Sequence, residues 1–339
     1  MERARPDLNI AEADLSQEAI ISIRDVSKHY GRRMALQGVS LDVGAGVTGL
    51  LGPNGSGKST LIKSLLGLVA IDSGRGRVLD NEWPAQTRAI RDIVGYLPED
   101  DCYIAGLQGV ECVQLAGQLS GLPRKESLRR SHEVMDFCDI GQERYRHVET
   151  YSTGMRQKLK FAQTLVHDPP LIILDEPTTG LDPGQRDALL NRIKVLARDH
   201  GKTILLSTHI LPDVRQVCDA VIILSAGQVR VAERLEVLSR PAEPGLSVVL
   251  ADGHDAFLAG LDRAGITWQR NARGELHLHR LPPDQAGRVW QVAFEAGAAI
   301  TRLEPAQASL EQIFMDTVRS LAPVAKPDRA IDEGSHANY

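Results

Sequence analysis

A nine-residue run near the start of the chain constrains the fold more than any other feature. Residues 52–60 read G-P-N-G-S-G-K-S-T and fit the phosphate-binding loop pattern G-x-x-x-x-G-K-[ST]. The apolar run 47–51 predicts a buried strand before the loop, and residues 61–68 predict a helix after it. This context directs backbone N–H groups and the positive end of a helix dipole at an anion. A chance glycine-rich turn lacks both flanking elements, so a nucleotide phosphate site is favoured.

The residues of this loop are expected to have different tasks. Backbone N–H groups would hold the β- and γ-phosphates of a nucleotide, the Lys58 ammonium would reach the same phosphates, and the Ser59 hydroxyl would bind Mg²⁺. The loop residues expected to bind the cofactor are Gly52, Pro53, Asn54, Gly55, Ser56, Gly57, Lys58, Ser59 and Thr60.

A second run, L-I-I-L-D-E-P at 171–177, predicts a buried strand that ends in two acids. Beside a phosphate loop, Asp175 is expected to hold Mg²⁺ directly or through water. Glu176 is expected to orient or deprotonate the attacking water. A strand that ends in a solvated acidic turn gives the same pattern, and the phosphate loop upstream favours the catalytic interpretation.

The overall composition argues against several classes of protein. The 339 residues carry a formal net charge of −5, whereas nucleic-acid binders usually show a basic excess. No apolar run is long enough to span a bilayer, and the first residues lack the apolar core of a signal peptide. The four cysteines form no C-x-x-C pair, which argues against a zinc site or a disulfide framework. We expect a cytosolic protein that binds no nucleic acid and reaches a membrane only through a partner.

Hydrophobic periodicity predicts an α/β domain followed by a smaller α+β domain. Strand-like runs surround the phosphate loop and return after residue 170, on either side of a helical subdomain at about 100–168. Prolines and a glycine at 241–245 predict the domain boundary. The expected organisation is a disordered tail at 1–18, a nucleotide-binding domain at 19–240, an accessory domain at 246–321 and a disordered tail at 322–339.

The accessory domain has the predicted order strand, helix, strand, strand, helix, strand. This is the order of a split βαβ, ferredoxin-like unit. A further helix is expected at 309–320 with Ser309 as its capping residue. His277 and His279 share one strand face, where a solvated surface is favoured over a metal site because further ligands are missing.

A third run, Y-S-T-G-M-R-Q at 151–157, predicts a helix capped by Ser152, with Gly154 allowing a close backbone approach. Taken alone, it is an ordinary capped helix. The order of motifs, however, resembles the nucleotide-binding subunits of ATP-binding cassette (ABC) transporters over about residues 20–240. The order is phosphate loop, Y-S-T-G-M-R-Q, L-I-I-L-D-E-P, T-T-G-L-D-P and S-T-H. The resemblance implies a P-loop NTPase fold of the α/β class with a helical subdomain.

The resemblance also implies roles for individual residues. Tyr30 would stack on adenine, and His209 would contact the γ-phosphate and hold the water with the base Glu176, so that Glu176, His209 and Lys58 are the expected catalytic residues. Each ATP would be sandwiched between two subunits. Ser152, Gly154 and the inter-subunit loop residue Asp182 would therefore act at the partner's nucleotide.

The resemblance implies cofactors and partners as well. The cofactors would be ATP and Mg²⁺, and the partners a second copy of the chain and an integral membrane permease subunit. The chain would lie on the cytoplasmic side of the cell membrane and dock through the helical subdomain. The C-terminal ending I-T-R-L-E-P-A-Q-A-S-L-E-Q-I-F is similar to that of the drug and natural-product export branch.

Two departures from the family pattern stand out. The usual L-S-G-G-Q signature has Tyr151, Thr153 and Met155 at its first, third and fifth positions here. Glu99 occupies the position of a usual glutamine, where a carboxylate can bind Mg²⁺ but adds negative charge near the phosphates.

An alternative of a different class is a soluble regulatory or mechanical ABC ATPase that acts on ribosomes or DNA. Such proteins usually carry two cassettes or a long coiled-coil insertion. This chain has one cassette, no heptad run and no basic excess. The transported substrate cannot be derived from the sequence, because the membrane partner would form the pathway.

Overall fold

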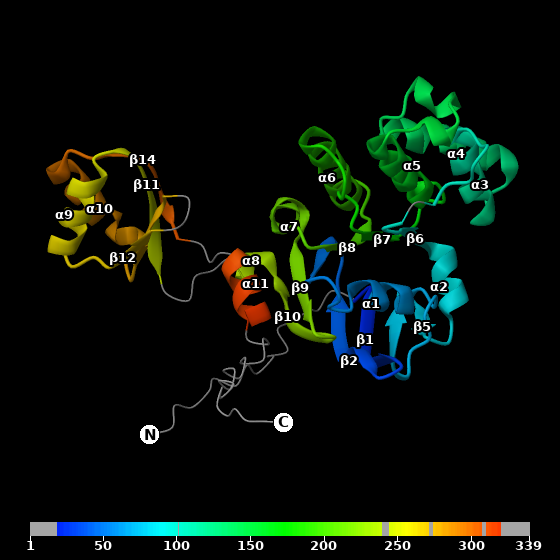
Figure 1. Ribbon diagram of the computed structural model, residues 1–339, viewed down its shortest axis with the longest axis horizontal. Coiled ribbons are helices and arrows are strands. Elements are labelled where there is room, and N and C mark those ends of the chain that lie inside the picture. Colours follow the sequence, from blue (N-terminus) through cyan, green and yellow to red (C-terminus); the bar gives the residue numbers. More distant parts are fainter. Residues whose placement is uncertain (1–18, 101, 239–243, 271–273, 307–309, 320–339) are drawn as a thin grey trace, which may run out of the picture.

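The computed structural model describes residues 19–100, 102–238, 244–270, 274–306 and 310–319. The tails expected at 1–18 and 322–339, the capping residue Ser309 and most of the boundary segment lie outside the described residues. Figure 1 shows two sheets with their helices before residue 239, and a separate third sheet with its own helices after residue 244.

A six-stranded sheet forms the centre of the first domain. Strands β3, β7 and β8 are buried over their whole length, as expected for parallel strands that are covered on both faces. All neighbouring pairs are parallel except β9 and β10. The order across the sheet is β10 (Gln228–Arg234), β9 (Ala220–Ser225), β3 (Val47–Leu51), β8 (Thr203–Thr208), β7 (Leu171–Asp175) and β6 (Val94–Leu97).

The carboxyl ends of parallel strands meet at one edge of a sheet, where ligands bind in open α/β folds. The phosphate loop follows β3, and Asp175 ends β7. His209 directly follows β8, and Glu99 lies two residues beyond β6. The topology therefore brings four segments that are far apart in the sequence to the same edge.

An antiparallel sheet covers one face of the phosphate-loop helix. Apolar residues of this sheet, of α1 and of the central sheet form one core, which includes Ile23, Leu61, Ile62 and Ile173. Helix α1 begins at Lys58, earlier than the expected 61, because the end of the phosphate loop itself forms the first turn. The elements are β2 (Arg33–Val43), β1 (Ile21–Tyr30), β4 (Ser73–Val78), β5 (Asn81–Trp83) and α1 (Lys58–Leu65).

Helices fill most of the chain between β6 and β7, as the sequence predicts. The helical subdomain contains α3 (Gly109–Leu119), α4 (Arg124–Phe137), two 3-10 turns (Gln142–Tyr145 and Val148–Thr150) and α5 (Thr153–Leu165). The other helices of the first domain are α2 (Thr87–Ile93), α6 (Pro183–Arg198), α7 (Leu211–Val217) and α8 (Leu235–Leu238). The buried faces of α3, α4, α5 and α6 share a core with the central sheet.

The C-terminal unit has its own core of apolar residues, which includes Val248, Phe257, Leu276 and Val289. Its strands lie in the order β12-β13-β11-β14, and every neighbouring pair is antiparallel. The succession of elements is the βαββαβ order indicated by the sequence. The elements are β11 (Gly245–Asp252), α9 (His254–Arg263), β12 (Trp268–Arg270), β13 (Leu276–His279), a 3-10 turn (Pro283–Gln285), α10 (Ala286–Ala296) and β14 (Ala299–Pro305).

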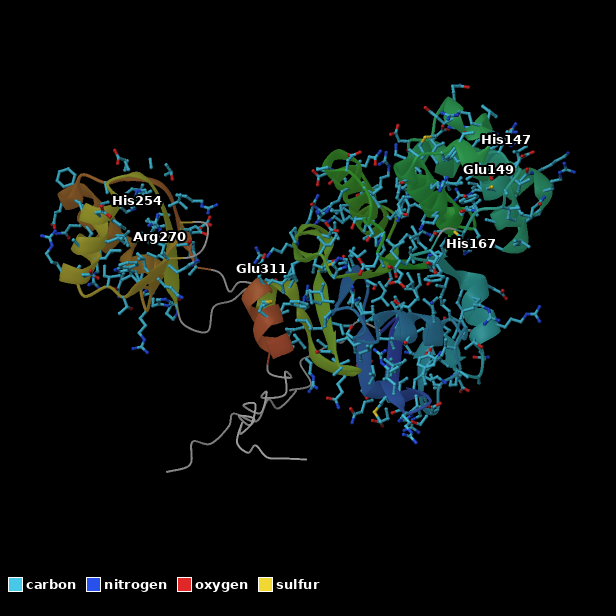
Figure 2. The ribbon with its side chains drawn as sticks, in the orientation of Figure 1. His147, Glu149, His167, His254, Arg270 and Glu311 are labelled. Atoms are coloured by element: carbon cyan, nitrogen blue, oxygen red, sulfur yellow. The ribbon has the colours of Figure 1, made fainter. Side chains whose placement is uncertain are left out.

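The last helix, α11 (Leu310–Arg319), packs on the first domain. Leu310 is buried in the core of that domain, and Ile313 and Phe314 pack against it. Arg215 of α7 forms an ion pair with Glu311, which Figure 2 labels beside the first domain. The sequence grouped this helix with the accessory domain, and its contacts with the first domain were not predicted.

Candidate active site

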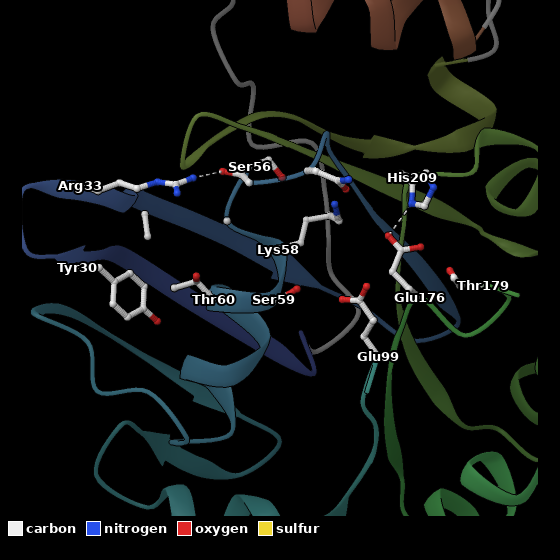
Figure 3. Close-up of a pocket in the computed structure, with 14 residues that line it drawn as sticks. Tyr30, Arg33, Ser56, Lys58, Ser59, Thr60, Glu99, Glu176, Thr179 and His209 are labelled. Carbon is white, nitrogen blue, oxygen red and sulfur yellow. Dashed lines mark hydrogen bonds and ion pairs between the residues drawn. The ribbon is translucent and has the colours of Figure 1, made fainter. Parts of the chain in front are cut away.

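A cavity of about 530 Å³ opens where the strands of the central sheet end (Figure 3). Of the residues expected to act at the nucleotide, those that line it are Tyr30, Asn54, Gly55, Ser56, Gly57, Lys58, Ser59, Thr60, Glu99, Glu176 and His209. Those outside its lining are Gly52, Pro53, Asp175, Ser152, Gly154 and Asp182. The structure thus joins the phosphate loop with the predicted base and switch histidine.

The shape of the phosphate loop depends on its glycines. Gly55 and Gly57 have φ angles of +77° and +110°, which L side chains rarely adopt. A Cβ atom on Gly57 would lie 2.6 Å from the Ala35 carbonyl oxygen, and one on Gly52 would lie 2.3 Å from that of Leu224. The loop is therefore packed so closely that only glycine fits, and the first N–H groups of α1 lie at its end.

Lys58 lies inside the cavity, between Tyr30 and the Glu176–His209 pair in the view of Figure 3. Its Nζ donates a hydrogen bond to the Gly52 carbonyl oxygen at 2.7 Å. Burial lowers the pKa of Lys58, and the nearby carboxylate of Glu176 opposes that shift. A buried cation that is held by the loop backbone suits an anionic ligand.

The predicted base and switch residue are in direct contact. His209 Nδ1 lies 2.9 Å from Glu176 Oε1 (Figure 3), and the Glu176 backbone N–H donates to the Ser207 carbonyl at 2.9 Å. Glu176 has a φ angle of +50°, a left-handed conformation that directs the chain sharply away from β7. Among the residues that the structure describes, the buried oxygens Glu176 Oε2 and Asp175 Oδ1 have no hydrogen-bond partner. They can accept hydrogen bonds from water or bind a cation.

Tyr30 and Arg33 form the opposite side of the cavity, on the hairpin between β1 and β2. The Tyr30 side chain is half exposed, and the Lys28 ammonium lies 5.4 Å from its ring centroid. Arg33 Nη2 approaches the Gly55 carbonyl oxygen at 3.5 Å. Sequence reasoning missed Arg33, Ala35 and Thr179 as lining residues. Arg33 could have been predicted from its position, because a cation that pairs with Tyr30 across a tight hairpin lies near the expected nucleotide.

The signature segment lies at the start of α5. Ser152 caps this helix by accepting a hydrogen bond from the Met155 N–H at 3.3 Å. A Cβ on Gly154 would lie 2.3 Å from Oε1 of Gln185, so the Gln185 side chain packs directly on the Gly154 backbone and would have to move to accept a larger residue. Tyr151, which departs from the family pattern, is buried in the core and donates its hydroxyl to the Glu143 carbonyl at 2.7 Å.

The segment that follows the base is tied to two helices. Asp182 caps α6 by accepting a hydrogen bond from the Gln185 N–H at 2.8 Å. Thr178 Oγ1 donates to the buried carboxylate of Asp213 at 2.6 Å, and Arg186 pairs with the same carboxylate at 2.5 Å. Because Asp213 belongs to α7, one buried acid joins the segment that follows His209 to the segment that follows Glu176.

The chain is similar to proteins of a known family. The family profile described as ABC transporter matches residues 36–179. The chain is 34% identical over 260 residues to the Nod factor export ATP-binding protein I of Paraburkholderia xenovorans. The matched region covers 76% of this chain and 84% of that protein. The chain belongs to the ATP-binding proteins of ABC transporters.

Two further likenesses extend this assignment. An uncharacterized ABC transporter ATP-binding protein of Bacillus subtilis, YxlF, is 29% identical over 304 residues, which is 89% of this chain and 100% of that protein. A solved structure of an ATP-binding subunit of an ABC transporter is 31% identical, with a TM-score of 0.59 over 65% of this chain and 91% of the other. The predicted P-loop NTPase fold is confirmed. The chain is an ATP-binding, ATP-hydrolysing ABC transporter subunit.

The described residues contain no helix with the length and apolar composition that crossing a bilayer requires.

Proposed function

We propose that this ABC ATPase powers export by driving a separate membrane subunit from the cytoplasmic side of the cell membrane. One observation carries the catalytic part of the proposal: the phosphate loop, Lys58 and the Glu176–His209 pair line one cavity. Export is supported by the similarity to the Nod factor export protein and by the resemblance of the C-terminal ending to the export branch.

In this proposal the cavity binds ATP in two parts. Tyr30 offers one ring face to adenine, while the phosphate loop and Lys58 hold the phosphates. Ser59, Asp175 and Glu99 are the proposed ligands of Mg²⁺. The unpartnered buried Asp175 Oδ1 fits this role, because hard cations prefer oxygen ligands. When bound, Mg²⁺ supplies charge neutralisation at the phosphates.

Glu176 is the proposed general base. Its Oε1 contacts His209 Nδ1, which fixes the orientation of the carboxylate, and its buried Oε2 has no partner in the described part of the chain. That oxygen can accept a proton from a water molecule aligned against the γ-phosphate. Lys58 stabilises the negative charge on the same phosphate.

A second copy of the chain is the proposed partner at the nucleotide. Ser152, Gly154 and Asp182 carry the family's inter-subunit motifs but do not line the cavity of their own chain. The N-terminus of α5, with Ser152 as cap, can receive a phosphate held by another subunit. ATP would then favour the closed pair and hydrolysis the open pair, a ligand-driven population shift.

The helical subdomain is the proposed contact with the membrane permease. The test is to express the tagged full chain in its native host, extract the membranes with detergent and purify the tag. Recovery of an integral membrane protein, with ATPase activity that depends on it, is the expected result. Recovery from the soluble fraction with ribosomes or DNA would instead support the regulatory ATPase.

Glu99 offers a sharper test of coupling. Glu99→Gln should leave ATP binding intact, because the phosphate loop and Tyr30 are unchanged, and should alter the number of ATP molecules hydrolysed per substrate exported. The measurement is ATPase rate against transport in vesicles that contain the complex. An unchanged ratio would contradict a role of the Glu99 charge in coupling.

A further inference from the structure

Buried polar side chains on α5 face the two strands that end at the active site. Gln157, Lys160 and Thr164 are spaced three and four residues apart, so they share one face of the helix. Gln157 Nε2 donates to the Pro177 carbonyl at 2.5 Å, whereas the single Thr164 hydroxyl proton has its nearer acceptor within α5, the Lys160 carbonyl at 2.8 Å. Gln157 thus bonds helix α5 to the backbone of the segment that follows β7.

Lys160 makes the strongest of these connections. Its side chain is buried, and its Nζ lies 3.1, 3.0 and 3.2 Å from the carbonyl oxygens of Pro98, Glu99 and Asp100. An ammonium group has three N–H donors, which match three consecutive acceptors. Hydrogen bonds from a charged donor are stronger than neutral ones. One buried cation therefore fixes the backbone at Glu99 and on both sides of it.

The two ends of this connection both concern the nucleotide. Glu99 lines the cavity together with Lys58 and Glu176. Helix α5 begins at its cap Ser152, the proposed contact with the nucleotide of the second subunit. A displacement of α5 must move the carbonyls that Lys160 holds, or break its three hydrogen bonds.

We propose that Lys160 is a positioning residue for ATP hydrolysis, which holds Glu99 in the cavity and transmits movement of the signature helix to it. The inference rests on the proposed roles of Glu99 and Ser152. A purely structural Lys160 would instead affect thermal stability without acting through Glu99.

The test compares Lys160→Met with Lys158→Met in the full chain. Lys158 lies on the same helix and also donates to a backbone carbonyl, that of Asp139, but on the exposed surface. Lys160→Met should lower kcat by about 10- to 100-fold, the scale for a misplaced group at a reaction centre. The dissociation constant of a non-hydrolysable ATP analogue should stay at the parent value. Lys158→Met should retain the parent kcat.

A double-mutant cycle with Glu99→Ala separates positioning from stability. Once the Glu99 side chain is absent, Lys160→Met should lower kcat little further. Full additivity in a folded protein would overturn the proposal, and so would a parent kcat in Lys160→Met. If Lys160→Met does not fold, Lys160→Gln replaces it in the same cycle. If neither variant folds, Lys160 serves the fold alone and the proposal fails.

The proposed function is tested on the parent chain, separately from the role of Lys160. A parent chain that binds the ATP analogue but does not hydrolyse ATP, alone or with its membrane partner, would refute the catalytic assignment. The Lys160 proposal is judged only by differences between variants and the active parent.

Discussion

Replacing Glu176 by glutamine isolates the chemical step from the architecture of the site. Glutamine has almost the same shape, and its Oε1 can still accept a hydrogen bond from His209 Nδ1, now at 2.9 Å from Glu176 Oε1. The second carboxylate oxygen is buried and has no partner among the described residues, so the new amide group breaks no hydrogen bond that the structure shows. The change therefore removes the proton acceptor and one negative charge, and little else.

The size of the effect follows from that loss. A positioned general base contributes about 10²- to 10⁴-fold to the rate. At about 1.36 kcal/mol for each factor of ten, this raises the activation free energy by about 2.7–5.4 kcal/mol. ATP should bind as tightly as to the parent or more tightly, because one carboxylate that faces the phosphate cavity has become neutral. The ATP-bound pair of subunits should accumulate.

The assay is single-turnover hydrolysis of radiolabelled ATP, with nucleotide affinity and oligomeric state measured on the same samples. Glu295→Gln is the control, because this exposed carboxylate lies on α10 and accepts a local hydrogen bond from Gln291, one turn earlier in the helix. It should keep the parent rate. If Glu176→Gln turned over at the parent rate, Glu176 would not be the base.

Three further variants test the adenine contact, the buried acid that joins α6 to α7, and the half-buried histidine just after α5. Tyr30→Ala should weaken ATP binding by about 1–3 kcal/mol, the scale of base stacking on an aromatic ring, whereas Tyr30→Phe should bind like the parent in calorimetry. Asp213→Ala should lower the free energy of unfolding by about 3 kcal/mol, near the lower limit for a broken buried pair, because Arg186 keeps access to water while Thr178 loses its acceptor. Burial lowers the pKa of His167 (Figure 2), so the unfolded chain binds that proton more readily and stability falls as the pH drops through the ordinary histidine value of 6.5. His167→Gln should lose less unfolding free energy than the parent between about pH 7.5 and pH 5.5 in urea titrations. The difference should correspond to the uptake of one proton on unfolding.

Each of these expectations has its own contrary result. Equal affinities of Tyr30→Ala and Tyr30→Phe for ATP would show that the Tyr30 ring does not contact adenine. An unfolding midpoint of Asp213→Ala at the parent value would mean that the buried acid does not fix its neighbouring segments. A larger loss of stability at acid pH in His167→Gln than in the parent would contradict a lowered pKa of His167.

Local pattern was enough to find the elements that carry the chemistry. The phosphate loop could be recognised from the sequence because one short segment supplies the strand, the glycines and the start of the helix. The acids after β7 were found because a buried strand that ends in Asp175 and Glu176 is also a local signal. The helix bounds differed by a few residues, as at α1, because the loop residues 58–60 are already helical.

Several contacts between distant segments outside the family motifs were not predicted. No sequence motif singled out Lys160, yet it is buried against three carbonyls about 60 residues earlier in the chain. Tyr151 looked like a departure in a functional motif, yet it is a core side chain. Helix α11 was assigned to the accessory domain by proximity in sequence, and its apolar face packs on the first domain.

The sequence alone determined the nucleotide chemistry, because the phosphate loop needs only neighbouring residues to be recognised and then favours the catalytic interpretation of the acidic strand end. Only the tertiary structure decided how the sites are connected: which cation holds Glu99, which acid joins α6 to α7, and where α11 binds. Those choices depend on side chains that are buried through long-range packing. A pattern of neighbours cannot tell a solvated lysine from one that is surrounded by carbonyl groups.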